Sequence, residues 1–176
     1  MSGKFLFTAC ALLLCVATAR ADVRITGSGL QIFAPGHAWR LVLPGDDWKL
    51  EEGKIRAEGS GFYYLVSSGR RDFHISIFVV KTDRCWSGDT CRALFWSNPG
   101  VFYQHPKDVR QFDRHGFSVV RFQLDEIGGV AVKQANLSAH AYVDGYWIDV
   151  RVSRAAADRV PDINTLITFF DSISLK

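Results

Sequence analysis

Hydrophobic positions in this chain fall into short runs that are separated by glycine, proline or charged residues. The runs have the length of β-strands and are rich in β-branched and aromatic residues. They lie at 23–26, 30–33, 39–43, 62–68, 74–80 and 117–124. Signals such as Pro44-Gly45 mark turns between them. The pattern predicts a mainly β protein.

The clearest pattern lies at 136–153, where two alternating segments flank Asp144-Gly145. This arrangement is a strong signature of a β-hairpin with a two-residue turn, and such a turn determines the register of the two strands. One face of the hairpin is apolar and is predicted to face the core: Leu137, Ala139, Ala141, Val143, Tyr146, Ile148, Val150 and Val152. The opposite face carries Ser138, His140, Tyr142, Trp147, Asp149 and Arg151.

Two segments have the features of helices. The segment 89–98 has Asp89 or Thr90 as a candidate N-cap and ends before a Pro-Gly pair. The segment 161–175 has proline in its first turn and an apolar stripe at helical spacing, formed by Ile163, Leu166, Ile167, Phe170 and Ile173. We expect this C-terminal amphipathic helix, about three turns long, to lie against the sheet.

The order of the predicted elements defines a fold class. Strands come first, then one helix, then further antiparallel strands and a closing helix, with no regular alternation of strand and helix. This order predicts an α+β protein in which a mainly antiparallel sheet is flanked by helices.

The first 21 residues have the features of a secretory signal peptide. Lys4 supplies a positive charge, residues 5–19 are apolar, and Ala19-Arg20-Ala21 offers a cleavage site. The apolar run is shorter than the roughly 20 residues that a spanning helix needs. We therefore expect residues 1–21 to be removed and residues 22–176 to form one globular domain, periplasmic or fully secreted, with no stable membrane span.

Removal of this leader changes the charge of the chain. It takes away Lys4 and Arg20, which lowers the formal net charge from +3 to +1. A nearly neutral chain gives no reason to expect a nucleic-acid partner.

The leader also carries Cys10 and Cys15, so only Cys85 and Cys91 would remain, in an oxidising compartment. Such a pair is predicted to form a disulfide. A redox site is less favoured because the spacing is C-x5-C, and a zinc site would need two further ligands that the nearby sequence does not supply.

Three stretches resemble the PsbP/Mog1-like group of small α/β/α proteins: WRLVLPGDDWKL at 39–50, AYVDGYWIDVRVS at 141–153 and LITFFDSISL at 166–175. The resemblance implies an α/β/α sandwich. In that group, bacterial secreted members are similar to accessory or binding proteins without an active site, plant lumenal relatives assist photosystem II, and Mog1 binds a small GTPase. The segment from Cys85 to Cys91 is not part of the group's pattern.

The predicted register places His140 opposite Asp149, and a carboxylate beside an imidazole is how a general base is oriented. Ser138 on the same face would complete a Ser-His-Asp set. Residues two apart on a strand lie roughly 6.5 Å apart, so we expect no hydrogen bond between Ser138 and His140. There is also no Gly-x-Ser-x-Gly motif. We favour a polar cross-strand ladder over a catalytic dyad.

A second set of candidate ligands lies at 105–115: His105, Asp108, Asp113 and His115. Interleaved basic residues would repel a cation: Lys107, Arg110 and Arg114. We therefore expect a charged, solvated connection here and no metal or other cofactor.

Aromatic residues offer the best candidate interaction surface: Trp86, Phe95 and Trp96 around the cysteine pair, with Tyr142, Trp147 and Arg151 on the hairpin. Trp, Tyr and Arg concentrate in binding hot spots, although these side chains could instead anchor a helix to the sheet. We expect a non-enzymatic secreted binding or accessory protein that contacts a protein partner, such as an inhibitor, immunity or envelope assembly factor. The alternatives are a small hydrolase using His140 and Asp149, and a carrier of a small apolar ligand or metal.

Overall fold

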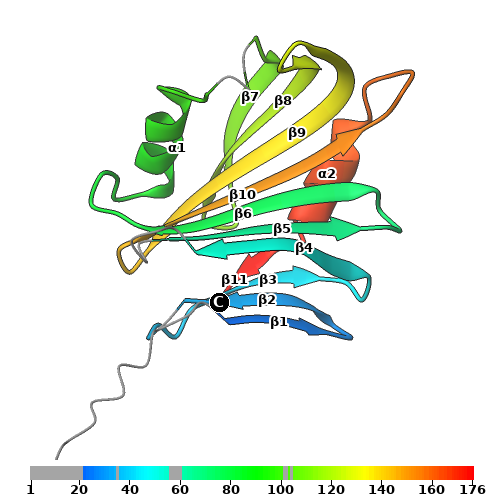
Figure 1. Cartoon of the computed structure of the whole chain (residues 1–176). Helices are drawn as coiled ribbons and strands as arrows, with labels where there is room; N and C mark the ends of the chain where they lie inside the picture. The colour runs from blue at the N-terminus through cyan, green and yellow to red at the C-terminus, as the bar shows by residue number, and fades with distance from the viewer. Residues whose placement is uncertain (1–21, 35, 56–60, 101–102, 104) are drawn as a thin grey trace, which may run out of the picture.

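The structure is a computed structural model, and it describes residues 22–34, 36–55, 61–100, 103 and 105–176. The predicted signal peptide lies outside these residues. The described chain forms two antiparallel sheets and two helices (Figure 1). This arrangement confirms the predicted α+β class, including the C-terminal helix.

The smaller sheet has four strands in the order β1 (Asp22–Thr26), β2 (Gly29–Phe33), β3 (Arg40–Pro44) and β11 (Ser174–Leu175). The larger sheet has seven strands in the order β4 (Trp48–Ile55), β5 (Gly61–Ser68), β6 (Phe73–Lys81), β10 (Tyr146–Ala155), β9 (Val130–Val143), β8 (Phe117–Ile127) and β7 (Lys107–Arg114). The helices are α1 (Gly88–Trp96) and α2 (Ile163–Phe170).

The two helices lie on opposite sides of the larger sheet (Figure 1). Helix α1 packs on β8 and β9, whereas α2 packs on β9 and β10. The main hydrophobic core joins the smaller sheet, α2 and the facing side of the larger sheet in one cluster. The polar face of the predicted hairpin is turned the other way, toward α1.

The register of the β9–β10 hairpin is the predicted one. Val143 pairs with Tyr146 across the turn, and His140 pairs with Asp149 three positions further along. The predicted core face is also confirmed, since Ala139, Ile148 and the other apolar members of that face all belong to or pack against the main core.

Two strands of the larger sheet, β4 and β7, were not predicted from the sequence. The segment 105–115 was expected to be a charged, solvated connection; its side chains are mostly exposed, but most of it forms strand β7. Both strands form edges of the larger sheet, and most of their side chains are exposed. A strand exposed on both faces needs no apolar alternation, and charged residues are common on such edges.

Helix α1 begins earlier than predicted. Its N-cap is Ser87, whose Oγ accepts the Thr90 N–H at 3.1 Å, while the Thr90 Oγ1 accepts the Ser87 N–H at 3.0 Å. This reciprocal capping box satisfies the free backbone donors of the first turn. Asp89 and Thr90 are therefore inside the helix, and neither is its N-cap.

Helix α2 is shorter than predicted. Asp162 is its N-cap and accepts the Asn164 N–H at 3.0 Å, and the helix ends at Phe170. Ile173 lies beyond the helix but is still buried in the main core. The chain then forms β11, which adds a short strand to the edge of β3.

Candidate functional site

Cys85 and Cys91 are joined by a disulfide, as the sequence predicts, with their Cα atoms 5.0 Å apart. Both cysteines are buried, but Trp86 between them is 72% exposed. The Trp86 N–H donates to the Thr90 Oγ1 at 3.0 Å, in addition to the capping box. The indole of Trp86 is therefore exposed, while the backbone of its loop is fixed by the disulfide and by the hydrogen bond to Thr90.

The first residue of α1 brings the helix directly onto β9. A Cβ atom on Gly88 would lie 2.5 Å from the carbonyl oxygen of His140, so no larger residue fits without movement of the backbone. This contact places Phe95 of the same helix over His140, with 5.6 Å between the ring centroids.

The other two aromatic residues near the loop anchor α1. Trp96 is half-buried and lies with its ring centroid 5.1 Å from that of Phe122 on β8. Phe95 is also half-buried and packs edge to face with Trp96. Of the three aromatic residues that the sequence grouped with the cysteines, Trp86 is the exposed one.

A chain of hydrogen bonds runs through the polar face of the hairpin. The Trp147 Nε1–H donates to Nδ1 of His140 at 3.2 Å. Since Nδ1 is an acceptor, the neutral ring carries its proton on Nε2, which donates to the Ser138 Oγ at 3.1 Å. The Ser138 hydroxyl then donates to Asp149 at 3.5 Å. The expectation that Ser138 and His140 would not interact is wrong, because the imidazole is long enough to reach along its own strand.

His140 is completely buried, and burial lowers its pKa below the ordinary value of 6.5. Asp149 raises this pKa, while Arg151 and Arg92 lower it, and the net direction is downward. The imidazole is therefore neutral at pH 7, in agreement with the hydrogen bond that it accepts from Trp147.

The order of these bonds differs from that of a hydrolytic triad. In a triad the imidazole accepts the proton of the serine hydroxyl, and the carboxylate binds the opposite ring nitrogen. Here Nε2 of His140 donates to Ser138, and Ser138 donates to the carboxylate of Asp149. The geometry favours a structural polar network over a nucleophile and its base.

Arg151 closes the network at its far end. Its Nε lies 3.0 and 3.2 Å from the carboxylate oxygens of Asp149, and Nη1 donates to the Tyr103 hydroxyl at 3.2 Å. The guanidinium also stacks over Phe95, 4.2 Å from the ring centroid. Burial disfavours the charged form, but the attraction of Asp149 outweighs it and raises the pKa of Arg151. The arginine is charged, and that charge is compensated inside the protein.

The remaining predicted site residues do not gather into a further site. Tyr142 pairs with Trp147 across the hairpin and is half-buried. The candidate ligands His105, Asp108, Asp113 and His115 are all exposed. Within the residues that the structure describes, no group of three or more His, Cys, Asp or Glu is placed to hold a metal ion.

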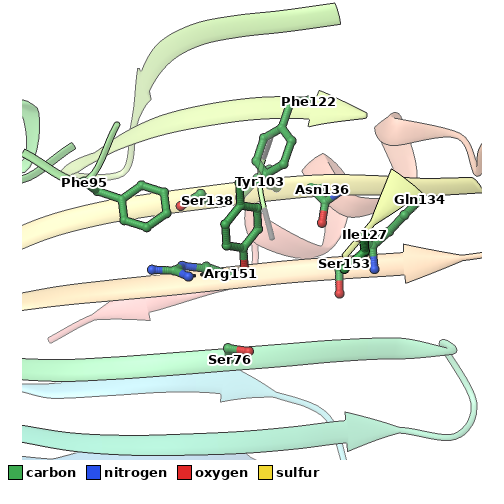
Figure 2. Close-up of a pocket in the computed structure, with 11 residues that line it drawn as sticks. Ser76, Phe95, Tyr103, Phe122, Ile127, Gln134, Asn136, Ser138, Arg151 and Ser153 are labelled. Carbon is green, nitrogen blue, oxygen red and sulfur yellow. Dashed lines mark hydrogen bonds between the residues drawn. The ribbon is translucent and has the colours of Figure 1, made fainter. Parts of the chain in front are cut away.

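Two cavities lie between α1 and the sheet, on either side of Phe95 and Arg151, which line both. The larger has a volume of about 460 Å³ and extends toward Thr82 and Trp147. The smaller, about 230 Å³, is here called the serine cavity because Ser76, Ser138 and Ser153 line it (Figure 2). The sequence prediction missed the serine cavity, although polar residues alternate at Gln134, Asn136 and Ser138 on the same face as His140.

Comparison with known proteins gives a distant structural similarity. No family model matches the sequence, and no curated protein matches it. One similar solved structure is LpqN of Mycobacterium tuberculosis, described as involved in cell envelope biogenesis, with a TM-score of 0.42 and 14% sequence identity over 80% of this chain and 86% of that chain. The resemblance to the PsbP/Mog1-like group stays a prediction, since no comparison shows it. In the described part of the chain, no helix is long and apolar enough to cross a membrane.

Proposed function

We propose that this protein is a non-enzymatic binding or accessory protein, periplasmic or secreted, that contacts a protein partner through the loop closed by Cys85 and Cys91. The observation that carries the proposal is Trp86, which is 72% exposed. Tryptophan is large and apolar, and it is among the residues that dominate the binding energy of protein interfaces.

The loop around Trp86 supports this role because it is held in place before any partner binds. The disulfide closes the loop, and the backbone N–H groups of Trp86 and Ser87 both donate to Thr90. A preorganised side chain loses less conformational freedom on binding, and more of its contact energy remains as affinity. A disulfide also agrees with an oxidising compartment outside the cytosol.

The test compares Trp86→Ala with Val130→Ala in capture of partners from periplasmic and secreted fractions. Val130 is a matched control because it is 65% exposed at the start of β9. We expect a protein that binds the wild type and Val130→Ala, and whose dissociation constant rises about thirtyfold with Trp86→Ala, the effect of an interface hot spot. Equal binding by all three proteins would contradict the proposal.

The weaker alternative is a small hydrolase that uses His140 and Asp149. Two features argue against it: the hydrogen bonds run from the imidazole to Ser138, and both members of the pair lie beneath α1 with at most 2% exposure. Asp149 does line the larger cavity, so the hydrolase retains one supporting observation. The hydrolase would be favoured if Trp86→Ala left partner binding unchanged and His140→Gln abolished a hydrolytic activity of the wild type.

A further inference from the structure

We infer that the serine cavity is a binding site for a small, uncharged, polyhydroxylated ring, such as a single sugar unit. This site is separate from the loop of Trp86 and does not depend on the function proposed for that loop. Four observations carry the inference: the layout of the floor, an unpartnered buried amide, the balance of charge and the size of the cavity.

The floor of the cavity is a small polar area spread over three adjacent strands. Ser76 on β6 pairs with Arg151 on β10, which pairs with Ser138 on β9. Two positions along, Ser153 on β10 pairs with Asn136 on β9. Since strands lie about 4.8 Å apart and residues about 3.4 Å apart along a strand, this floor measures roughly 10 by 7 Å. Hydrogen-bonding groups are therefore distributed over an area and not along one line.

Asn136 supplies the strongest indication of a missing partner. Its side chain lines the cavity and is 5% exposed, yet among the residues that the structure describes its amide nitrogen Nδ2 has no hydrogen-bond partner. In Figure 2 the amide oxygen of Asn136 points toward the strand that carries Ser153. Buried polar groups in folded proteins are nearly always paired, and an unpaired one requires an explanation. A hydroxyl group of a bound molecule would donate to the amide oxygen that faces this strand.

The charges around the cavity favour an uncharged occupant. Arg151 is the charged residue of the lining, and Asp149 already binds its guanidinium. The charge of Arg151 is already compensated by Asp149, so an anion would find no uncompensated cation in the lining, and a cation would meet Arg151. Either would be transferred from water without a free counter-charge, which is unfavourable.

The size and walls of the cavity favour a single ring. Its volume of about 230 Å³ is below the range of roughly 300–1,000 Å³ that is typical of sites for drug-sized ligands. Phe95, Tyr103 and Phe122 form apolar walls above the polar floor (Figure 2). A sugar ring has apolar C–H groups for such walls and hydroxyl groups around its perimeter. A flat lactam such as uracil has all its polar groups in the plane of the ring and fewer of them than a sugar has, so it would reach fewer of the floor residues.

Isothermal titration calorimetry on the full protein tests the inference with the methyl glycosides of glucose, galactose and mannose. Glucuronate serves as the charged analogue and uracil as the flat lactam. We expect at least one glycoside to bind at least about tenfold more tightly than either of these compounds, the effect of one buried hydrogen bond. No binding by any glycoside, or equal binding by glucuronate or uracil, would overturn the inference.

The variant Asn136→Leu separates a binding role from a structural one. We expect it to weaken glycoside binding at least about tenfold. In the same variant the melting temperature without ligand should rise, because an unpartnered amide is removed from the interior. Asn98→Leu, at an exposed position after α1, is the matched control and should change neither quantity. Retained glycoside binding in Asn136→Leu would overturn the assignment of this site. Trp86→Ala lies outside the cavity and should bind the glycoside as tightly as the wild type does.

Discussion

At the scale of single residues, the buried ion pair of Arg151 and Asp149 is the feature of the polar face whose disruption should cost the most stability. Asp149 is 2% exposed, and its carboxylate depends on the guanidinium for compensation. Arg151→Leu should lower the free energy of unfolding by about 3–5 kcal/mol, because it leaves a buried charge without its partner. Urea unfolding followed by circular dichroism measures this change.

The double variant Asp149→Asn, Arg151→Leu is the control for that prediction. It removes both charges, so we expect it to be more stable than Arg151→Leu alone. If the double variant were as unstable as the single one, the loss would come from the packing of the arginine against Phe95 and Tyr103 instead of from its charge.

His140 predicts a dependence of stability on pH. Its pKa is lowered in the folded protein, so below pH 6.5 the unfolded chain binds more protons than the folded chain. The free energy of unfolding should therefore fall as the pH falls from 7 to 5.5, with a limiting slope of about 1.4 kcal/mol per pH unit. The measurement is urea unfolding at several pH values.

His140→Gln supplies the comparison, because glutamine has no titrating group and can still donate to Ser138. The difference in stability between the wild type and this variant should narrow toward low pH. A difference that does not change with pH would mean that folding does not lower the pKa of His140.

Residue-level contacts were the least predictable part of the candidate site. The pairing of His140 with Asp149 followed from the register, but the hydrogen bond between His140 and Ser138 depends on how the imidazole extends along its strand. Likewise, the sequence places Asn136 on the polar face but cannot show that its amide nitrogen lacks a partner among the described residues. Such features depend on side-chain rotamers and on distant elements, and neither follows from spacing.

At the scale of elements, the approach of α1 to β9 depends on Gly88. A methyl group there would meet the backbone carbonyl of His140 at 2.5 Å. Gly88→Ala should therefore lower the free energy of unfolding by about 1–3 kcal/mol through overpacking. Gly69→Ala is the matched control, because no atom of the described residues lies within 4 Å of the added Cβ. Equal melting temperatures of the two variants would show that α1 can move away from β9 without loss of stability.

The elements that were predicted correctly are those with a strong local signal. Asp144-Gly145 between alternating segments determined both the hairpin and its register. The edge strands β4 and β7 were missed because their mostly exposed, charged residues have the composition of a solvated loop. The end of α2 was misplaced because Ile173 continues the helical spacing, although the chain turns there to reach β11.

At the scale of the whole molecule, the two sheets share one hydrophobic core, and the C-terminal strand β11 pairs with β3 of the smaller sheet. The last residue, Lys176, exchanges two backbone hydrogen bonds with Arg40, at 2.7 and 3.0 Å, beside the pairing of β11 with β3. Leu30 of β2 is fully buried in the core that also contains Val150 of β10. A substitution that destabilises the smaller sheet should therefore also destabilise the larger sheet.

Leu30→Ala tests this coupling. The substitution should lower the free energy of unfolding by about 2–5 kcal/mol, since it removes buried methyl groups and leaves a cavity. Amide hydrogen exchange should accelerate by the same factor in the protected amides of β2 and of β9, because both sheets would unfold in one transition. Faster exchange in β2 alone would show that the smaller sheet opens independently.

The hydrogen bond from Trp147 to His140 decides which tautomer the imidazole adopts. In the opposite tautomer, Nδ1–H would face Asp149, which lies 3.7 Å away, and Nε2 would accept from Ser138. That arrangement has the polarity of a proton relay that activates a serine. The two arrangements differ in the position of one hydrogen atom on the imidazole of His140, and the indole N–H of Trp147 determines that position.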